Sequence, residues 1–285
     1  MGSKLILNPT FTNLLSERRP DGTIPRHAYS KWKGAHWVLS ILADLGYPPG
    51  DEDLIPLREQ VLEWLFSEEH TQHFDKRIVA GKVRMHPSQE GNAVYSLITL
   101  GLADERIEPL IQRMVEWQWP DGGWNCDMKP HVQISSFNES LIPLRALAAY
   151  REHTGDEKLA PVIERAAEIF LKRRLYKRVS NGNVMNSDFK ALHYPCYWHY
   201  DILYALKVLA EAGMISDPRC GDALDLLESK RLPDGGFPAE KKYYQADRPE
   251  KSGNSVVDWG GASKMKSNPW VTADARKVLK AAGRG

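Results

Sequence analysis

The segment Gln118-Trp-Pro-Asp-Gly-Gly-Trp124 indicates the architecture of this chain because it recurs. Arg231-Leu-Pro-Asp-Gly-Gly-Phe237 repeats it closely, and Arg18-Arg-Pro-Asp-Gly-Thr-Ile24 repeats it more faintly. Proline cannot continue a helix, aspartate suits a turn and glycine permits a positive φ, so each copy predicts an abrupt helix end. We expect Trp124 to fold back onto the helix before it and Gln118 to hydrogen-bond a neighbouring helix end.

Helical runs of two kinds alternate between these copies. We predict five apolar inner helices, each preceded by an amphipathic outer helix of which the first is short. The inner helices are expected near residues 31–45, 91–102, 137–151, 198–212 and 272–282. Long loops favour a closed ring over an open stack of hairpins. The prediction is an all-α protein: one α/α-toroid domain over residues 1–285, with five to six hairpins whose inner helices line a central cavity.

Charge and composition exclude several classes of protein. The 38 Lys and Arg residues balance 37 Asp and Glu residues, and this net charge of +1 disfavours a charge-driven nucleic-acid binder. No apolar run is long enough for a transmembrane segment, and the start of the chain lacks the plan of a signal peptide. Three widely spaced cysteines argue against a disulfide framework. We therefore expect a cytoplasmic protein, and the sequence leaves its oligomeric state open.

The spacing of Gln118, Gly122 and Trp124 resembles the QW repeat of terpenoid cyclases. The run Ser135-Ser-Phe-Asn-Glu-Ser-Leu141 and the helix-pair period are also similar to the squalene-cyclase and protein-prenyltransferase superfamily, whose domains are α/α toroids. The other copies are degraded, because arginine stands in place of the glutamine. The Asp-x-Asp-Asp motif with which class II cyclases protonate their substrate is absent, and the nearest run, Asp51-Glu-Asp53, reads as a helix start. The resemblance implies a hydrophobic isoprenoid-type substrate, with cyclisation or prenyl transfer as the reaction.

Ionisable residues cluster where the inner helices are expected to begin. If these helices line a ring, their first turns meet at one end, which we call the mouth. The candidate acid–base groups there are His36, Glu139, His199 and Asp201, because a neutral histidine near an enclosed carboxylate exchanges protons around pH 7. His199 and Asp201 diverge on one helix, so each is expected to pair across the ring. The alternative for both histidines is a buried structural role.

Aromatic residues on the inner helices predict a substrate-binding wall. Tyr200, Tyr204 and Lys207 are spaced as a helical stripe that should face the cavity. Such a wall favours an apolar or cationic guest, and it also suits stacking on sugar rings. N-capping is the alternative role for four polar residues, Asn92, Ser135, Thr272 and Asp274. The full set of predicted substrate-binding residues is Trp32, Trp37, Glu90, Asn92, Tyr95, Trp198, Tyr200 and Tyr204.

The sequence leaves the function and the cofactor open between alternatives. The first hypothesis is a terpenoid cyclase-like or prenyltransferase-like protein that encloses a hydrophobic small molecule. The second is an α/α-toroid polysaccharide lyase or glycosidase, with Glu139 paired with Asp201 or Glu90. The third is a non-catalytic ring that binds a hydrophobic ligand. No cofactor is expected, although Cys126, His193 and Cys196 together offer a weak zinc signal. The loop from Lys241 to Asn268 is a candidate lid.

Overall fold

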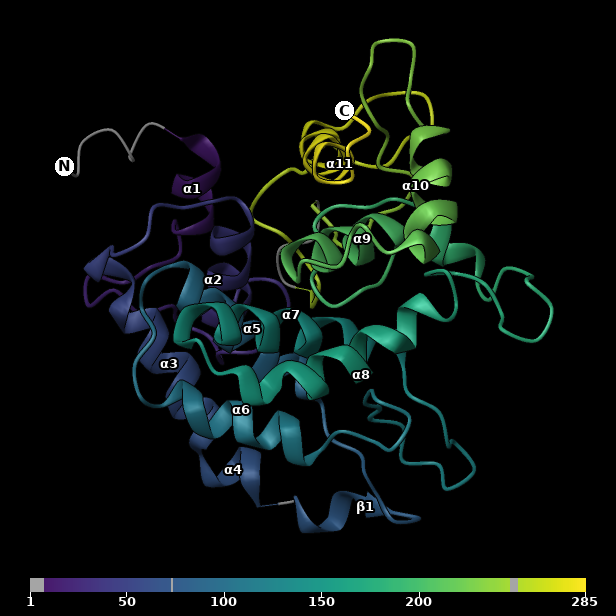
Figure 1. The fold of residues 1–285 in the computed structure, drawn as a ribbon. Helices are drawn as coiled ribbons and strands as arrows, with labels where there is room; N and C mark the ends of the chain where they lie inside the picture. Colours follow the sequence, from purple (N-terminus) through teal and green to yellow (C-terminus); the bar gives the residue numbers. More distant parts are fainter. Residues whose placement is uncertain (1–7, 73, 247–250) are drawn as a thin grey trace.

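Helices make up nearly all the regular structure of this protein, whose computed structural model describes residues 8–72, 74–246 and 251–285 (Figure 1). The inner helices are α2 (Ala35–Asp44), α5 (Pro87–Thr99), α7 (Phe137–Thr154), α9 (Ile202–Glu211) and α11 (Pro269–Ala281). The outer helices are α1 (Pro9–Leu14), α3 (Ile55–Phe66), α6 (Ile107–Glu116), α8 (Ala160–Leu171) and α10 (Gly221–Glu228). A further short helix, α4, spans Glu68–Thr71. Two strands of two residues each, β1 (Ile78–Val79) and β2 (Lys82–Val83), pair as an antiparallel hairpin. Within the described ranges, no helix combines the length and the apolar character that crossing a membrane requires.

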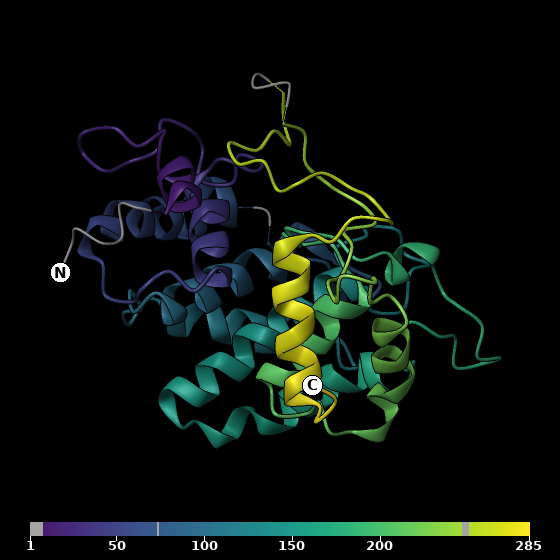
Figure 2. The ribbon, with the colours of Figure 1, turned by 90° about the horizontal axis from the view of Figure 1, so that it is seen from above.

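The inner helices pack against one another in chain order. Contacts run from α2 to α5, then to α7, α9 and α11, while α3, α6, α8 and α10 each pack on the outside of the inner helix before them. Figure 2 shows α11 lying beside the helices of the C-terminal half, away from the α2 and α3 pair. The loop before α2 meets the loop before α11: the Gly253 backbone N–H donates to the Lys31 carbonyl, and the Trp32 indole N–H donates to the Tyr243 carbonyl. The predicted all-α toroid is confirmed.

The repeated Pro-Asp-Gly segments adopt one backbone conformation. The same hydrogen bond from a backbone N–H to the carbonyl four residues later closes each turn, at Arg19 (2.8 Å), Trp119 (2.8 Å) and Leu232 (2.9 Å). In two copies the aspartate also accepts a bond from the serine hydroxyl that precedes the next inner helix. Gly122 is required at its turn, since φ is 102° and a Cβ atom there would lie 2.3 Å from the Arg165 carbonyl oxygen.

Both contacts expected of the segment 118–124 are present. The Gln118 side chain donates to the carbonyls of Gly122 (2.8 Å) and Val162 (2.9 Å), and so ties the end of α6 to the neighbouring outer helix α8. Trp124 folds back onto α6, where its indole N–H donates to the Met114 carbonyl at 2.8 Å. The turn therefore joins adjacent hairpins through side chains as well as through the chain itself.

The inner helices begin close to their predicted positions, but the capping residues differ. Ser136, Asp201 and Asn268 accept the capping bonds of α7, α9 and α11. The capping alternative was therefore wrong for all four residues. Asn92 lies inside α5, and the Ser135 hydroxyl bonds Asp121. The Thr272 hydroxyl bonds the Phe237 backbone, and Asp274 pairs with a buried lysine. Because Asp201 is a cap, α9 begins at Ile202 and not near residue 198. His199 and Tyr200 thus lie in a loop, where helical spacing does not govern their direction.

Candidate functional site

Aromatic and histidine rings touch in a continuous row across the mouth. His199 lies 6.0 Å from Trp32, whose ring stacks on Tyr197 at 3.8 Å and meets Trp37 edge-on at 4.8 Å. Trp37 touches His36, His36 touches Trp64, and Trp64 touches His70. We call this row the aromatic belt, defined by His193, Trp198, His199, Tyr243, Trp32, Tyr197, Trp37, His36, Tyr29, Trp64 and His70. It joins the loop before α9 to the helices α2, α3 and α4.

The His199 ring lies between two aromatic rings at one end of the belt. Ring centroids are 3.5 Å apart for Tyr243 and 4.3 Å apart for Trp198. Burial and the neighbouring His193 lower the pKa of His199 to about 3, so the imidazole is neutral at physiological pH. Its Nδ1 atom and the Trp198 Nε1 atom are buried without a hydrogen-bond partner among the described residues.

His193 and Asp201 form a buried pair within one loop. The Nδ1 atom of His193 lies 2.7 Å from a carboxylate oxygen of Asp201, and both side chains are 1% exposed. A carboxylate only accepts, and the Ala191 carbonyl lies 3.4 Å from the same nitrogen, so Nδ1 carries the proton. With the donor hydrogen at Nδ1, the Nε2 atom is the ring position that can accept a proton, and none of the described residues bonds it. Asp201 does not pair across the ring as expected, because its other bonds hold the backbone of His193 and Tyr204.

His36 is enclosed at the other end of the belt. The rings of Tyr29, Trp37 and Trp64 lie 4.9–5.6 Å from it, and neither of its nitrogens is bonded within the described part of the chain. Burial lowers the pKa of His36 to about 3. Nearby Glu90 is 1% exposed and lies 3.3 Å from His70 and 3.6 Å from Arg113. These contacts place Glu90 between Arg113 and the His70 end of the belt.

His36 makes the stability of the protein sensitive to acid. Its pKa in the fold lies below that of the unfolded chain, so the unfolded state binds more protons between about pH 6.5 and pH 3. The free energy of unfolding therefore falls as the pH drops through this window. We expect His36→Phe to remove about 2 kcal/mol of the loss between pH 7 and pH 5, measured by urea unfolding at each pH. The same slope in both proteins would contradict this.

Glu139 lies beside Cys126 and His86. The sequence did not predict the contact with Cys126, and it did not single out His86 at all. One Glu139 carboxylate oxygen is 3.7 Å from Cys126 Sγ and 3.7 Å from His86 Nδ1. Hydrogen bonds to Cys126 and Glu139 raise the pKa of His86 to about 10. The zinc set suggested by sequence is not assembled, since the His193 ring bonds Asp201 and Cys126 has other neighbours. His86 carried one signal that could have found it, its position directly before the proline that starts α5.

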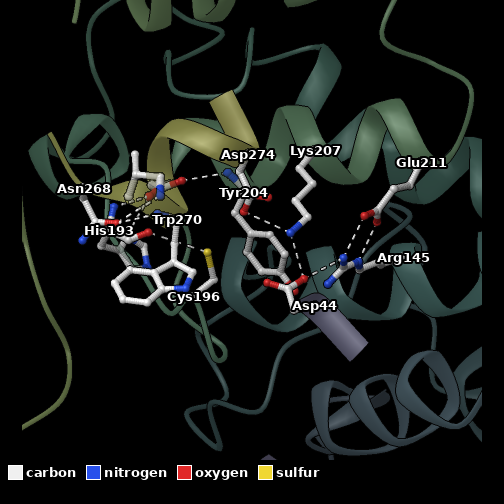
Figure 3. Close-up of polar contacts among 12 residues, drawn as sticks. Asp44, Arg145, His193, Cys196, Tyr204, Lys207, Glu211, Asn268, Trp270 and Asp274 are labelled. Carbon is white, nitrogen blue, oxygen red and sulfur yellow. Dashed lines mark hydrogen bonds and ion pairs between the residues drawn. The ribbon is translucent and has the colours of Figure 1, made fainter. Parts of the chain in front are cut away.

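Buried ion pairs join the inner helices farther from the mouth (Figure 3). Lys207 of α9 lies 2.9 Å from Asp44 of α2 and 3.0 Å from Asp274 of α11. Arg145 of α7 lies 2.9 Å from Asp44 and 2.6 Å from Glu211. Burial alone would raise the pKa of Asp44, but Lys207 and Arg145 hold it well below its usual range. In the sequence, these residues are single charges inside otherwise apolar helical runs, which is the signal that could have pointed to buried ion pairs.

The predicted substrate-binding residues divide between these two regions. Trp32, Trp37, Asn92 and Trp198 lie at the mouth, and the Nδ2 atom of Asn92 has no bonding partner in the described ranges. Tyr95 accepts a bond from Arg145 at 2.7 Å, and the Tyr204 ring lies 5.6 Å from the same guanidinium. Tyr200 was wrongly placed on the stripe. Its hydroxyl bonds the Leu175 carbonyl and its ring packs on Phe137, Phe170 and Phe189, toward outer helix α8.

Comparisons with known proteins give distant structural similarities. No family model and no curated protein matches the sequence. A sugar epimerase from a ruminal bacterium is 13% identical, with 97% of this chain and 95% of that one covered at a TM-score of 0.43. A cellobiose 2-epimerase from Bacillus thermoamylovorans is 12% identical, with 81% and 74% covered at 0.42. A type II terpene cyclase from Scytonema is 16% identical, with 96% of each chain covered at 0.35. At these scores the similarities carry no argument about activity.

Proposed function

We propose that this protein is an enzyme that moves a proton at a carbon atom of a sugar-type substrate, with His193 as the base. The His193–Asp201 pair carries this proposal. Asp201 holds the imidazole in the tautomer whose Nε2 atom accepts a proton, and it stabilises the imidazolium that forms afterwards. The Tyr243 ring, 4.9 Å from His193, and the stacked His199 ring lie beside this base.

Unbonded polar atoms at the mouth favour a sugar over an isoprenoid. A buried donor or acceptor without a partner costs about 1–3 kcal/mol, and a ligand rich in hydroxyl groups supplies the missing partners. Flat rings such as Trp32 and Trp198 suit the apolar faces of sugar rings. The atoms without a partner in the described residues are His36 Nδ1 and Nε2, Asn92 Nδ2, His193 Nε2, Trp198 Nε1 and His199 Nδ1.

The carboxylates at the mouth favour proton abstraction over glycoside hydrolysis. A glycosidase needs one free carboxylic acid and one free carboxylate on opposite sides of the bond it cleaves. Asp201 is fully engaged with His193 and the start of α9, and Glu90 is engaged with His70 and Arg113. Glu139 is engaged with His86, Cys126 and the Ser88 backbone. The acceptors without a partner among the described residues are imidazole nitrogens, which suit removal of a proton next to a carbonyl or carboxylate group. This step leads to elimination in a lyase and to inversion in an epimerase.

Deuterium exchange tests the proposal before the product is known. Purified protein is incubated in D₂O with reducing disaccharides and with uronate-containing oligosaccharides, and NMR follows loss of carbon-bound hydrogen. We expect exchange with one substrate class, and His193→Gln should lower its rate by about 10²–10⁴-fold. His153→Gln is the control, because His153 is exposed near the end of α7. Exchange at an unchanged rate in His193→Gln would refute the role of His193.

An isoprenoid substrate remains the second candidate because the belt also forms an apolar wall. Trp32, Trp37 and Tyr197 are at most 6% exposed and meet in stacked and edge-on contacts, which suit a cationic intermediate through cation–π attraction. Incubation with polyprenyl diphosphates and squalene, followed by gas chromatography of the extract, distinguishes the candidates. Cyclised or transferred products, with no deuterium exchange in sugars, would replace the first proposal by the second.

A further inference from the structure

We propose that His86, Cys126 and Glu139 bind a zinc ion at the mouth of the ring, in a site with one position open to a water molecule or substrate oxygen. Three potential ligand atoms, one from each residue, all lie within 4.8 Å of one another. Two ligand atoms on a tetrahedral zinc ion, at bond lengths of about 2.0–2.3 Å, are about 3.3–3.6 Å apart. The distances of 3.7 Å from Glu139 to His86 Nδ1 and to Cys126 Sγ are close to this spacing.

The three side chains converge on one point and do not form a relay. In a cysteine–histidine–carboxylate triad, one imidazole nitrogen faces the thiol and the other faces the carboxylate. Here Glu139 faces Nδ1 of His86, whereas Nε2 lies 3.4 Å from the Arg77 guanidinium. Glu139 itself also contacts the thiol, with the same oxygen atom. Metal binding through Nδ1 displaces the proton from that nitrogen and leaves the one on Nε2, while the Arg77 side chain donates to the Arg84 carbonyl at 3.3 Å.

The donor set selects zinc among common metal ions. One sulfur, one nitrogen and one oxygen donor suit Zn²⁺, whereas Mg²⁺ and Ca²⁺ take oxygen ligands. Three protein ligands with an open fourth position are the arrangement of catalytic zinc sites. The His86 side chain is 39% exposed, so this side of the cluster is accessible to solvent.

Neighbouring helices hold the ligands in place. Glu139 lies in the first turn of α7, and His86 is the residue before α5, which packs directly against α7. The Ser88 backbone N–H donates to the second Glu139 oxygen at 3.3 Å and leaves the first oxygen facing the cluster. Cys126 lies two residues after Trp124, whose indole N–H bonds the Met114 carbonyl of α6. The turn at 118–124 therefore also positions the Cys126 thiol.

Metal binding to the purified full-length protein tests the site without any substrate. After chelator treatment, Zn²⁺ is titrated by calorimetry, and Co²⁺ is added separately to follow its absorption spectrum. We expect one ion per chain and a thiolate-to-cobalt charge-transfer band. Cys126→Ser should abolish the band and weaken Zn²⁺ binding at least 100-fold, and His86→Gln and Glu139→Gln should each weaken it at least 10-fold. Cys220→Ser is the matched control and should change neither measurement, because Cys220 lies before α10.

Three outcomes would overturn the proposal. They are the absence of stoichiometric metal binding, a charge-transfer band that survives in Cys126→Ser, and a band that is lost in Cys196→Ser instead. Circular dichroism of each variant separates loss of the ligand from loss of the fold. The result is independent of the proton-transfer proposal, because His193 is not a ligand of this site: a protein that binds zinc and shows no deuterium exchange would refute only that proposal.

Discussion

Lys207→Met is expected to lower the free energy of unfolding by about 3–5 kcal/mol, measured by urea denaturation at pH 7. Lys207 lies between Asp44 and Asp274, whose side chains are only 8% and 10% exposed. Methionine fills a similar volume but supplies no charge, so two carboxylates would remain together in a poorly solvated interior. Arg145 continues to pair with Asp44, whereas Asp274 forms no other ion pair within the described ranges. Burial already raises the pKa of Asp274 despite the attraction of Lys207, and the variant should raise it further.

Two further variants isolate the buried charge from the loss of a lysine. Lys177→Met removes an ion pair with Asp222 in which both side chains are more than a quarter exposed, and it should cost about 0–1 kcal/mol. Adding Asp274→Asn to Lys207→Met should restore part of the lost stability, because one uncompensated charge is then removed. Equal losses in Lys207→Met and Lys177→Met would contradict the importance of burial.

Trp124→Ala is expected to cost about 3–5 kcal/mol of unfolding free energy, because it removes a large side chain that is 1% exposed. The substitution leaves a cavity between α6 and the loop before α7, and it leaves the Met114 carbonyl without its indole donor. Cys126 follows Trp124 by two residues, and the Trp124 backbone bonds Ser136 and Ser140 at the start of α7, where Glu139 lies, so the variant should also weaken Zn²⁺ binding. Thermal unfolding and metal titration of the same sample check both effects.

Trp124→Phe is the conservative comparison, and the repeat itself suggests it. Phe237 occupies the corresponding place in the copy at 231–237, where it is fully buried. Phenylalanine at 124 would keep most of the packing and lose the hydrogen bond, so we expect a cost of about 1–2 kcal/mol. A cost as large as that of Trp124→Ala would mean that the hydrogen bond, and not the packing, carries the stability of this turn.

Local chemistry explains why the helices were predictable from the chain alone. The turn at 118–124 ends a helix through proline and glycine, and its glutamine and tryptophan reach partners that any hairpin of this period presents. Apolar periodicity likewise marks inner and outer helices, since residues three and four positions apart share a helix face, and the chain itself shows whether one face or most faces are apolar. The start of α9 was misplaced because Asp201 has two roles, as helix cap and as partner of His193.

The candidate site was predictable only in its composition. Glu139, His36 and His199 were recognised as ionisable residues near the mouth, and the structure does place them there. Their partners came from elsewhere in the chain: His86 beside Glu139, His193 beside Asp201, and Tyr243 over His199. No spacing rule links such pairs, because long loops of irregular conformation bring them together.

The sequence by itself determined the helical repeat, because helix ends, turns and amphipathic faces depend on residues within a few positions of one another. The tertiary structure decided which charges meet inside the ring. Lys207 pairs with Asp44, which lies 163 positions away in the chain, and Arg145 pairs with the same carboxylate from 101 positions away. Such pairs form because burial without a partner is costly, and only the packed arrangement of the inner helices offers each charge its partner.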